Sequence, residues 1–267
     1  MIRCFQKSRI ASAAVMILSV ILCAMIWIHD QNRPVYIPAI ASGLMLAVGV
    51  CLSLLLGNLI AAQQNSRLLS VLHMELDPES FVRSYKHIPS GITNKASRAI
   101  ACSYLADGYC AMGQWDLALN TMCSDFTDKK GREILSLRCL YYNNCCSYLI
   151  LKGDTVQAKE TLEQLKSSIQ TAEKENPALA KNMKESLCLY ENWLRYLDGQ
   201  TADTAFLTKA IAKCRFRIRR LEMQYLLALT FLREQRRKEA LSLLEQIQKE
   251  GGKHYLKKEA GRLMETV

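Results

Sequence analysis

Two long stretches near the beginning of the chain contain no charged residue, and they constrain the fold more than any other feature. Residues 10–28 carry no charge over 19 positions, and residues 35–62 carry none over 28. A helix rises 1.5 Å per residue, so the first stretch would span about 28 Å, close to the thickness of a bilayer's hydrocarbon core. The second is long enough to cross at a tilt. We therefore predict transmembrane helices at about 10–28 and 38–62, within an anchor of residues 1–62.

The residues around these stretches indicate a helical hairpin. Pro34 and Pro38 would break the helix between the two spans, and Trp27 and Tyr36 suit the membrane interface at that end. Small residues recur four positions apart in the second span, a spacing that lets helix backbones approach closely. They are expected to pack against a helix of the same hairpin or of another chain, and they are Gly49, Ser53 and Gly57.

The basic residues at the start set the expected orientation. Arg3, Lys7 and Arg9 precede the first span, whereas the connecting segment carries only Arg33. A signal peptide is the main alternative for the first span, but its apolar stretch is too long and no cleavage-like site follows before Trp27. The positive-inside rule then predicts a two-span protein of the cell membrane, with both termini in the cytoplasm.

The cysteines agree with a cytoplasmic location. There are eleven, an odd number, and no C-x-x-C pair occurs. That pattern argues against both a disulfide framework and a zinc site. Small buried thiols in a reducing compartment are the simpler interpretation.

The rest of the chain predicts an all-α fold. Apolar residues recur at three and four positions among good helix formers, and no segment shows sustained two-residue alternation. Twelve Gly and five Pro in 267 residues leave few turns for a β-sandwich.

Three segments from residue 105 onward share one internal spacing: a small residue after a large one, a turn, and then Ala-x3-large. They read Leu105-Ala106-x2-Tyr109-x3-Gly113-x-Trp115-x2-Ala118-x3-Met122, Cys145-Cys146-x2-Leu149-x3-Gly153-x-Thr155-x2-Ala158-x3-Leu162, and Leu227-Ala228-x2-Phe231-x3-Gln235-x-Arg237-x2-Ala240-x3-Leu244. The small residues would let two helices pack closely, and Gly113 and Gly153 lie where the first helix must end. Asp116 and Asp154 favour the start of the next helix.

This pattern resembles the tetratricopeptide repeat, here behind a two-helix membrane anchor of bacterial type. The resemblance implies an α-solenoid over residues 93–267 with a concave groove for a protein or peptide, and a terminal capping helix near 253–266. Residues 63–92 would form a helical linker that includes a helix starting at Asp77-Pro78. A degenerate repeat would fill residues 178–214 after a helix start at Asn176-Pro177, with its register left open.

Matching positions in the repeats give candidate groove residues. For each residue taken singly, a position on a solvated helix face is the favoured interpretation. They are Ser103, Asp107, Asn143, Ser147, Tyr225, Leu229 and Arg233.

Positive charge is concentrated in the last quarter of the chain, where residues 205–267 hold 15 Lys and Arg against 7 Asp and Glu. Three interpretations remain open: a solvated face, contact with anionic lipid, or an acidic protein partner. Nucleic-acid binding is disfavoured because aromatic residues do not interleave with the charges and no nucleic-acid-binding module is recognisable. The densest run, a candidate basic surface, is Lys209, Lys213, Arg215, Arg217, Arg219 and Arg220.

No catalytic, cofactor-binding or metal-binding motif is recognisable, so we expect no enzyme and no cofactor. Asp125 and Asp128 could bind a cation, but Lys129 and Lys130 follow them directly and favour a solvated turn. The leading hypothesis is a membrane-anchored scaffold that recruits a protein partner. The alternatives are a structural subunit assembled through the hairpin and an anionic-lipid-contacting domain.

Overall fold

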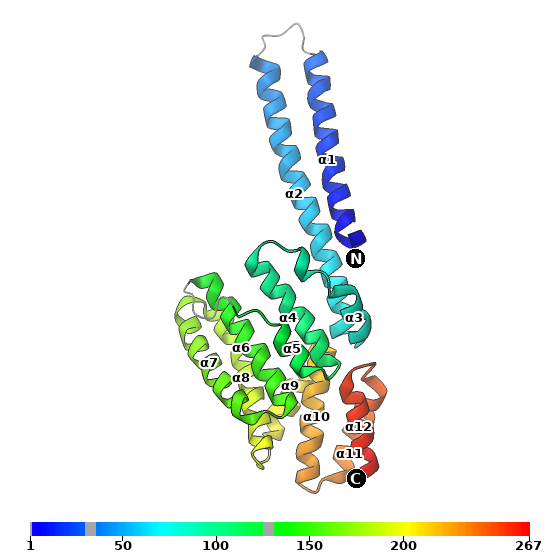
Figure 1. Ribbon diagram of the computed structural model, residues 1–267, viewed down its shortest axis with the longest axis vertical. Coiled ribbons are helices and arrows are strands. Elements are labelled where there is room, and N and C mark those ends of the chain that lie inside the picture. The colour runs from blue at the N-terminus through cyan, green and yellow to red at the C-terminus, as the bar shows by residue number, and fades with distance from the viewer. Residues whose placement is uncertain (1, 30–35, 125–130) are drawn as a thin grey trace. The chain divides into compact units, whose positions relative to one another are not determined.

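The computed structural model describes residues 2–29, 36–124 and 131–267, and Figure 1 shows them as helices joined by short connections. No strand occurs in these residues, which confirms the all-α prediction. The chain divides into two compact units, residues 1–68 and 69–267, which are described separately below.

The first unit contains helix α1 (Ile2–His29) and most of helix α2 (Tyr36–His73). Both are long and apolar enough to cross a membrane, over Ile10–His29 and Ala39–His73. Large apolar side chains point outward uncovered along both, with Ile17 61% and Leu59 66% exposed. Pro38 lies in the first turn of α2, where a missing N–H is tolerated. Pro34 and Arg33 fall in residues 30–35, outside the described part.

Small residues form the contact between α1 and α2. Ser12 and Ser53 each donate a hydroxyl hydrogen bond to the other's backbone carbonyl at 3.0 Å. A Cβ added to Gly49 would lie 2.1 Å from Ser19 Oγ, so only glycine fits at that position. Gly57 is also buried. Gly49 and Ser53 therefore pack within the hairpin, which answers the question that the sequence left open for these two residues.

The second unit begins within α2, at residue 69. Its first elements are the last turn of α2, helix α3 (Pro78–Tyr85) and the 3-10 helix η1 (Pro89–Gly91). Leu72, Leu76, Phe81 and Tyr85 in this region are at most 2% exposed. These four residues are thus part of a packed core, within the compact unit of residues 69–267.

Four successive pairs of helices follow along the chain. In three of them the two helices pack against each other, whereas in the third pair α8 packs mainly on α7 and α9 packs mainly on α10. Asp154 and Asn176 cap α7 and α8 through backbone N–H groups, as their sequence positions predict. The pairs are α4 (Lys95–Ala111) with α5 (Trp115–Thr121), α6 (Arg132–Lys152) with α7 (Thr155–Glu175), α8 (Pro177–Leu197) with α9 (Thr204–Lys213), and α10 (Arg217–Arg233) with α11 (Arg237–Glu250).

The small residues of the repeated pattern lie at the contacts between helices. All six are 0% exposed: Ala106, Cys146, Ala228, Ala118, Ala158 and Ala240. In the second pair, Cys146 Sγ lies 3.8 Å from the carbonyl oxygen of Ala158, which joins the two small positions directly. A larger side chain at any of these positions would displace the neighbouring helix.

The α8–α9 pair shows why its register was unreadable. Counting back seven residues from the turn glycine, as in the other pairs, places Asn192 in the small position. Asn192 is 7% exposed, and its Oδ1 accepts a hydrogen bond from the Asp203 backbone N–H at 2.6 Å. A polar side chain thus occupies the position of the small residue and hydrogen-bonds to the connection between α8 and α9. This connection, residues 198–203, is longer than those of the other pairs.

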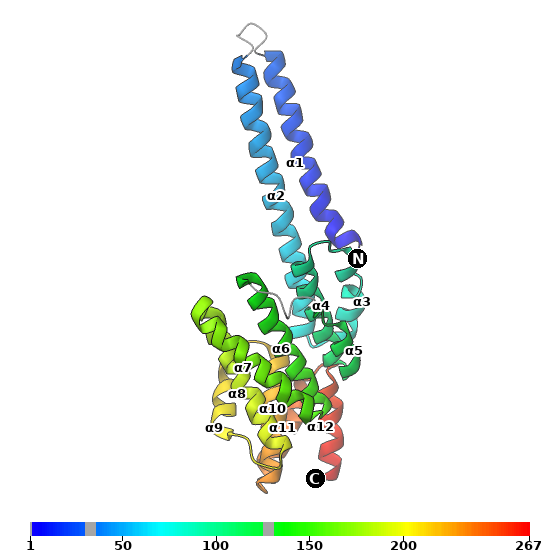
Figure 2. The ribbon, with the colours of Figure 1, turned by 60° about the vertical axis from the view of Figure 1, so that its left-hand side comes forward.

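The final helix, α12 (Tyr255–Thr266), joins the two ends of the second unit. Both views show its start beside α5 (Figures 1 and 2). The Tyr255 ring lies edge-on to Trp115 with centroids 5.6 Å apart, and Lys253 Nζ pairs with the Asp77 carboxylate at 2.7 Å. The C-terminal helix therefore packs against the start of the array as well as against α11.

Candidate functional site

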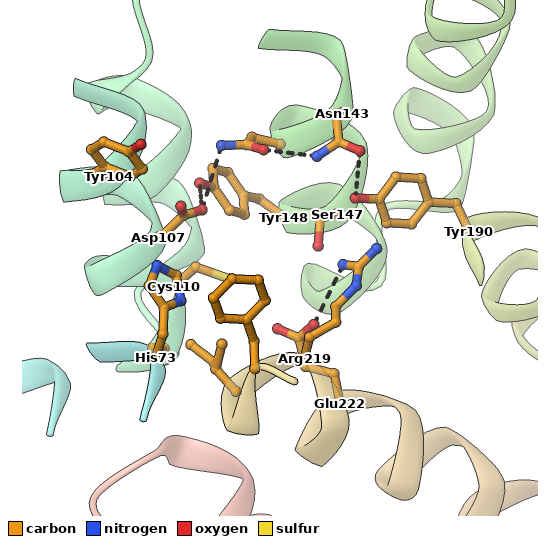
Figure 3. Close-up of a pocket in the computed structure, with 14 residues that line it drawn as sticks. His73, Tyr104, Asp107, Cys110, Asn143, Ser147, Tyr148, Tyr190, Arg219 and Glu222 are labelled. Carbon is orange, nitrogen blue, oxygen red and sulfur yellow. Dashed lines mark hydrogen bonds and ion pairs between the residues drawn. The ribbon is translucent and has the colours of Figure 1, made fainter. Parts of the chain in front are cut away.

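A cavity of about 330 Å³ lies among the first helices of the four pairs. Its walls come from α4, α6, α8 and α10, and the last turn of α2 adds His73. Figure 3 shows the labelled side chains of these elements converging on one space. Binding sites for small ligands usually measure about 300–1,000 Å³, so this cavity could hold a small molecule or a side chain. We call it the Asp107 pocket.

A chain of hydrogen bonds crosses one wall of the Asp107 pocket (Figure 3). Tyr148 Oη donates to Asp107 Oδ1 at 2.5 Å, and Asn144 Nδ2 donates to the same oxygen at 3.4 Å. Asn143 Nδ2 donates to Asn144 Oδ1 at 2.9 Å, and Tyr190 Oη donates to Asn143 Oδ1 at 3.1 Å. The chain runs from α4 through α6 to α8, so it orients polar groups on three helices together.

The opposite wall carries an arginine that already has partners. Arg219 Nη1 lies 3.6 Å from Glu222 Oε2, and Arg219 Nη2 donates to Ser186 Oγ at 3.2 Å. The guanidinium also lies 5.3 Å from the centre of the Tyr190 ring, within cation–π range. Its charge is thus shared between a carboxylate, a hydroxyl and an aromatic face.

Burial shifts the proton affinities in the pocket. It raises the pKa of Asp107 to about 7, although the hydrogen bond from Tyr148 partly opposes this rise. Burial also raises the pKa of Glu222, which Arg219 opposes, and it lowers the pKa of His73. Near neutral pH, Asp107 can therefore gain or lose a proton while His73 remains uncharged.

An exposed aromatic side chain marks one side of the pocket. Phe216 immediately precedes α10 and is 59% exposed, and its ring centroid lies 5.6 Å from that of His73. Aromatic side chains are enriched in protein–protein interfaces relative to the rest of the surface. Phe216 is therefore a suitable position from which to probe what approaches the Asp107 pocket.

The structure brings together only some of the predicted groove residues. Asp107, Asn143 and Ser147 line the Asp107 pocket. Ser103 is 1% exposed and donates to the Ile100 carbonyl, so no ligand could reach it in this conformation.

The groove residues predicted on α10 lie elsewhere. Tyr225 and Leu229 are half-buried against the core. Arg233 is exposed. Its guanidinium stacks on Tyr196 at 3.8 Å and donates to the backbone carbonyls of Tyr196 in α8 and Gln200 in the α8–α9 connection. The α10 residues that do line the pocket come from its first two turns.

The basic run divides between surface and interior. Lys209, Lys213 and Arg215 are exposed. Arg217 donates to the backbone carbonyls of Met74 and Glu250, both at 2.9 Å. Arg220 lies 3.7 Å from the Glu250 carboxylate, and Arg219 points into the Asp107 pocket. Half of the run thus remains as an exposed basic surface.

Sequence reasoning did not identify Tyr104, Tyr148, Tyr190 or Glu222 as site residues. A usable signal existed for two of them, because Tyr104 precedes Asp107 by three positions and Glu222 follows Arg219 by three. Nothing in the sequence indicated that the start of α10 would face α4.

Among the described residues, no group of three or more His, Cys, Asp or Glu side chains is placed to hold a metal ion. Asp125 and Asp128 lie outside the described residues. The chain matches no protein-family model, no curated protein and no solved structure.

Proposed function

We propose that the protein is a membrane-anchored adaptor. In this proposal the hairpin of α1 and α2 spans the cell membrane with both termini in the cytoplasm, and the second unit binds a protein partner there. The helix pairs would form a tetratricopeptide-like array whose first helices face the partner. The Asp107 pocket carries the proposal, since it is lined by residues from the first helix of every pair.

Two further observations support recognition as the role of the second unit. The pocket combines oriented polar groups with exposed aromatic surface, which suits selective binding of a side chain or chain end. The six small residues at the helix contacts have the spacing and burial expected of tetratricopeptide-like packing.

The two alternatives have different support. Assembly of a membrane complex through Gly49 and Ser53 is disfavoured, because both residues already pack against α1. For contact with anionic lipid, the exposed candidate residues are Lys209, Lys213 and Arg215. At about 1 kcal/mol for each basic residue near the surface, three such residues would give only weak association.

Site-specific photo-cross-linking of the full chain in its native membrane tests the proposal. Phe216 is replaced by benzoylphenylalanine, which preserves an aromatic ring at an exposed position beside the pocket. The matched control places the same residue at Val156, which is 69% exposed on α7 and does not line the pocket.

We expect a discrete protein adduct from position 216 that is missing from position 156. Adducts identical at both positions would mean that the array does not recognise its partner through the pocket. Lack of any protein adduct at position 216, with the variant at normal abundance in the membrane, would contradict the adaptor function.

A further inference from the structure

We propose that the Asp107 pocket binds an organic ammonium group, with the Asp107 carboxylate as its counter-ion. When the ammonium belongs to a lysine side chain of a protein partner, the inference rests on the proposed function. When it belongs to a free amine, the inference stands without it. The argument depends on the charge balance, the lining and the size of the pocket.

The pocket holds more negative than positive charge when its acids are ionised. Asp107 and Glu222 contribute two carboxylates, and Arg219 contributes one guanidinium. Arg219 lies 3.6 Å from Glu222, so these two charges offset one another. Within the described part of the chain, no Lys, Arg or His forms an ion pair with Asp107, whose hydrogen-bond donors are the neutral Tyr148 and Asn144. A half-buried carboxylate whose hydrogen-bond partners are neutral favours a cationic ligand.

The lining suits an ammonium group for a second, independent reason. Tyr104, Tyr148, Tyr190 and Phe216 all contribute to the walls. Aromatic faces attract organic cations, and several rings around one carboxylate form a typical ammonium site. Ser147 adds a hydroxyl that Figure 3 shows pointing into the same space, where it could accept a hydrogen bond from an N–H donor.

An anionic ligand fits poorly. Arg219 is the cationic side chain that lines the pocket, and it is already held by Glu222, Ser186 and the Tyr190 ring. An anion would have to displace Glu222 and would then lie near the Asp107 carboxylate.

The volume limits the ligand to something small. About 330 Å³ is at the lower end of the range for small-ligand sites, so one alkylammonium chain fits but a folded peptide does not. A lysine side chain entering from a partner and a free polyamine share this chemistry. The experiment below separates them.

The test measures binding to the full chain in detergent micelles by isothermal titration calorimetry. The probes are spermidine and three capped tripeptides, Gly-Lys-Gly, Gly-Nle-Gly and Gly-Glu-Gly, where norleucine is the uncharged counterpart of lysine. We expect the lysine peptide or spermidine to bind at least tenfold more tightly than the norleucine and glutamate peptides. Binding by the lysine peptide alone points to a protein ligand, and binding by spermidine alone points to a free amine.

Asp107→Asn should weaken binding of the preferred amine at least tenfold. Asparagine keeps an oxygen that can accept from Tyr148, so the fold should survive, and circular dichroism verifies this. The matched control is Asp116→Asn, which removes a carboxylate on α5 whose side chain is 76% exposed, outside the pocket. Affinity equal to wild type in Asp107→Asn would overturn the inference.

A pH series on the wild-type chain gives a second measurement that does not depend on a variant. The titratable groups facing Asp107 are His73 from α2, Tyr104 and Cys110 from α4, Tyr148 from α6, Tyr190 from α8, and Arg219 and Glu222 from α10. Burial keeps the pKa of Asp107 at about 7, lowers that of His73, and raises those of the tyrosines and Cys110. Amine affinity should therefore rise between pH 6 and pH 8, with proton release on binding near pH 6. An affinity that falls over this range contradicts the inference.

The two proposals can fail separately. A protein adduct at position 216 without binding of any amine would leave the adaptor function standing and remove the ammonium site. Spermidine binding without any protein adduct would support the ammonium site and contradict the adaptor function. Equal binding of the lysine and norleucine peptides would indicate an apolar cavity and would overturn the ammonium site.

Discussion

At the scale of single residues, the turn within each helix pair depends on one backbone position. Gly113 and Gly153 occupy it with φ of 76° and 84°, in the left-handed region that glycine adopts freely. In the last pair the same position holds Gln235 with φ of 62°. For a residue with a Cβ this conformation is less favourable by roughly 1–2 kcal/mol, so the turn of the last pair is strained relative to the turns that have glycine at this position.

Gln235→Gly should therefore stabilise the second unit by about 0.5–1 kcal/mol, the relief of strain less the added flexibility of glycine. Gly153→Ala should destabilise it by about 1 kcal/mol for backbone reasons alone, because a Cβ there meets nothing within 4 Å. Thermal unfolding of the full chain in detergent, followed by circular dichroism, measures both. A lower melting temperature for Gln235→Gly would show that contacts of the glutamine side chain stabilise the fold by more than the backbone strain at this position destabilises it.

Asp107 gives the stability of the second unit a pH dependence. Burial raises the pKa of Asp107 from an ordinary 3.8 to about 7, so between these values the folded chain keeps a proton that the unfolded chain has lost. Its contribution to folding is complete below about pH 4 and is lost as pH rises to 7. Asp107→Asn removes this loss, so it should raise the melting temperature at pH 8 but leave it nearly unchanged at pH 4.5. At about 1.4 kcal/mol for each pKa unit, the free energy of unfolding at pH 8 should rise by up to about 4 kcal/mol. Asp116→Asn, scanned at both pH values, is the control. Equal shifts at the two pH values would mean that Asp107 does not titrate there.

At the scale of elements, the hairpin is held by small side chains rather than by large apolar ones. In the proposed membrane anchor both helices would face lipid, which competes equally for large apolar groups, so close backbone approach would supply the specificity. Gly49 is the tightest point of the contact, where an added Cβ would lie 2.6 Å from the Ser19 Cβ.

Gly49→Val should therefore separate α1 from α2, whereas Gly43→Val should not, because a Cβ at Gly43 meets nothing within 4 Å. Cysteines at positions 12 and 53, which are hydrogen-bonded in the wild type, report the separation through oxidative cross-linking in membranes. The native Cys4, Cys23 and Cys51 are first replaced by Ser, and a protease site within residues 30–35 reveals which chains are cross-linked. The cross-linked fraction should fall in Gly49→Val alone, and a similar fall in both variants would argue against this contact.

At the scale of the whole molecule, contacts between distant parts of the sequence complete the second unit. Tyr255 packs on Trp115, and the Lys253 backbone N–H donates to the Leu76 carbonyl at 2.8 Å. An open array of helix pairs needs only neighbour contacts, whereas these join its beginning to its end. Local unfolding of one of these regions should therefore destabilise the other.

Tyr255→Ala should cost about 2–4 kcal/mol of stability, as expected for removing a large aromatic side chain from a packed contact. Hydrogen exchange should show residues 111–115 and 252–256 losing protection together, while the matched control Lys258→Ala, at an exposed position on the same helix, leaves both unchanged. Loss of protection confined to 252–256 would show that the two ends are not coupled.

The sequence by itself determined the features that depend on neighbours along the chain. Uncharged length predicts two helices able to cross a membrane, because each residue adds a set rise. Spacing placed six small residues that prove fully buried, and capping chemistry located the starts of α3, α7 and α8.

Only the tertiary structure decided which residues share the Asp107 pocket. Residues of α4, α6, α8 and α10 line it together, although these helices are separated by long stretches of sequence. For that reason Tyr225 and Leu229 were predicted to face the groove, but Arg219 and Glu222 line the pocket. Local periodicity specifies a helix and its buried face, whereas the meeting of four helices depends on long-range packing that no single segment encodes.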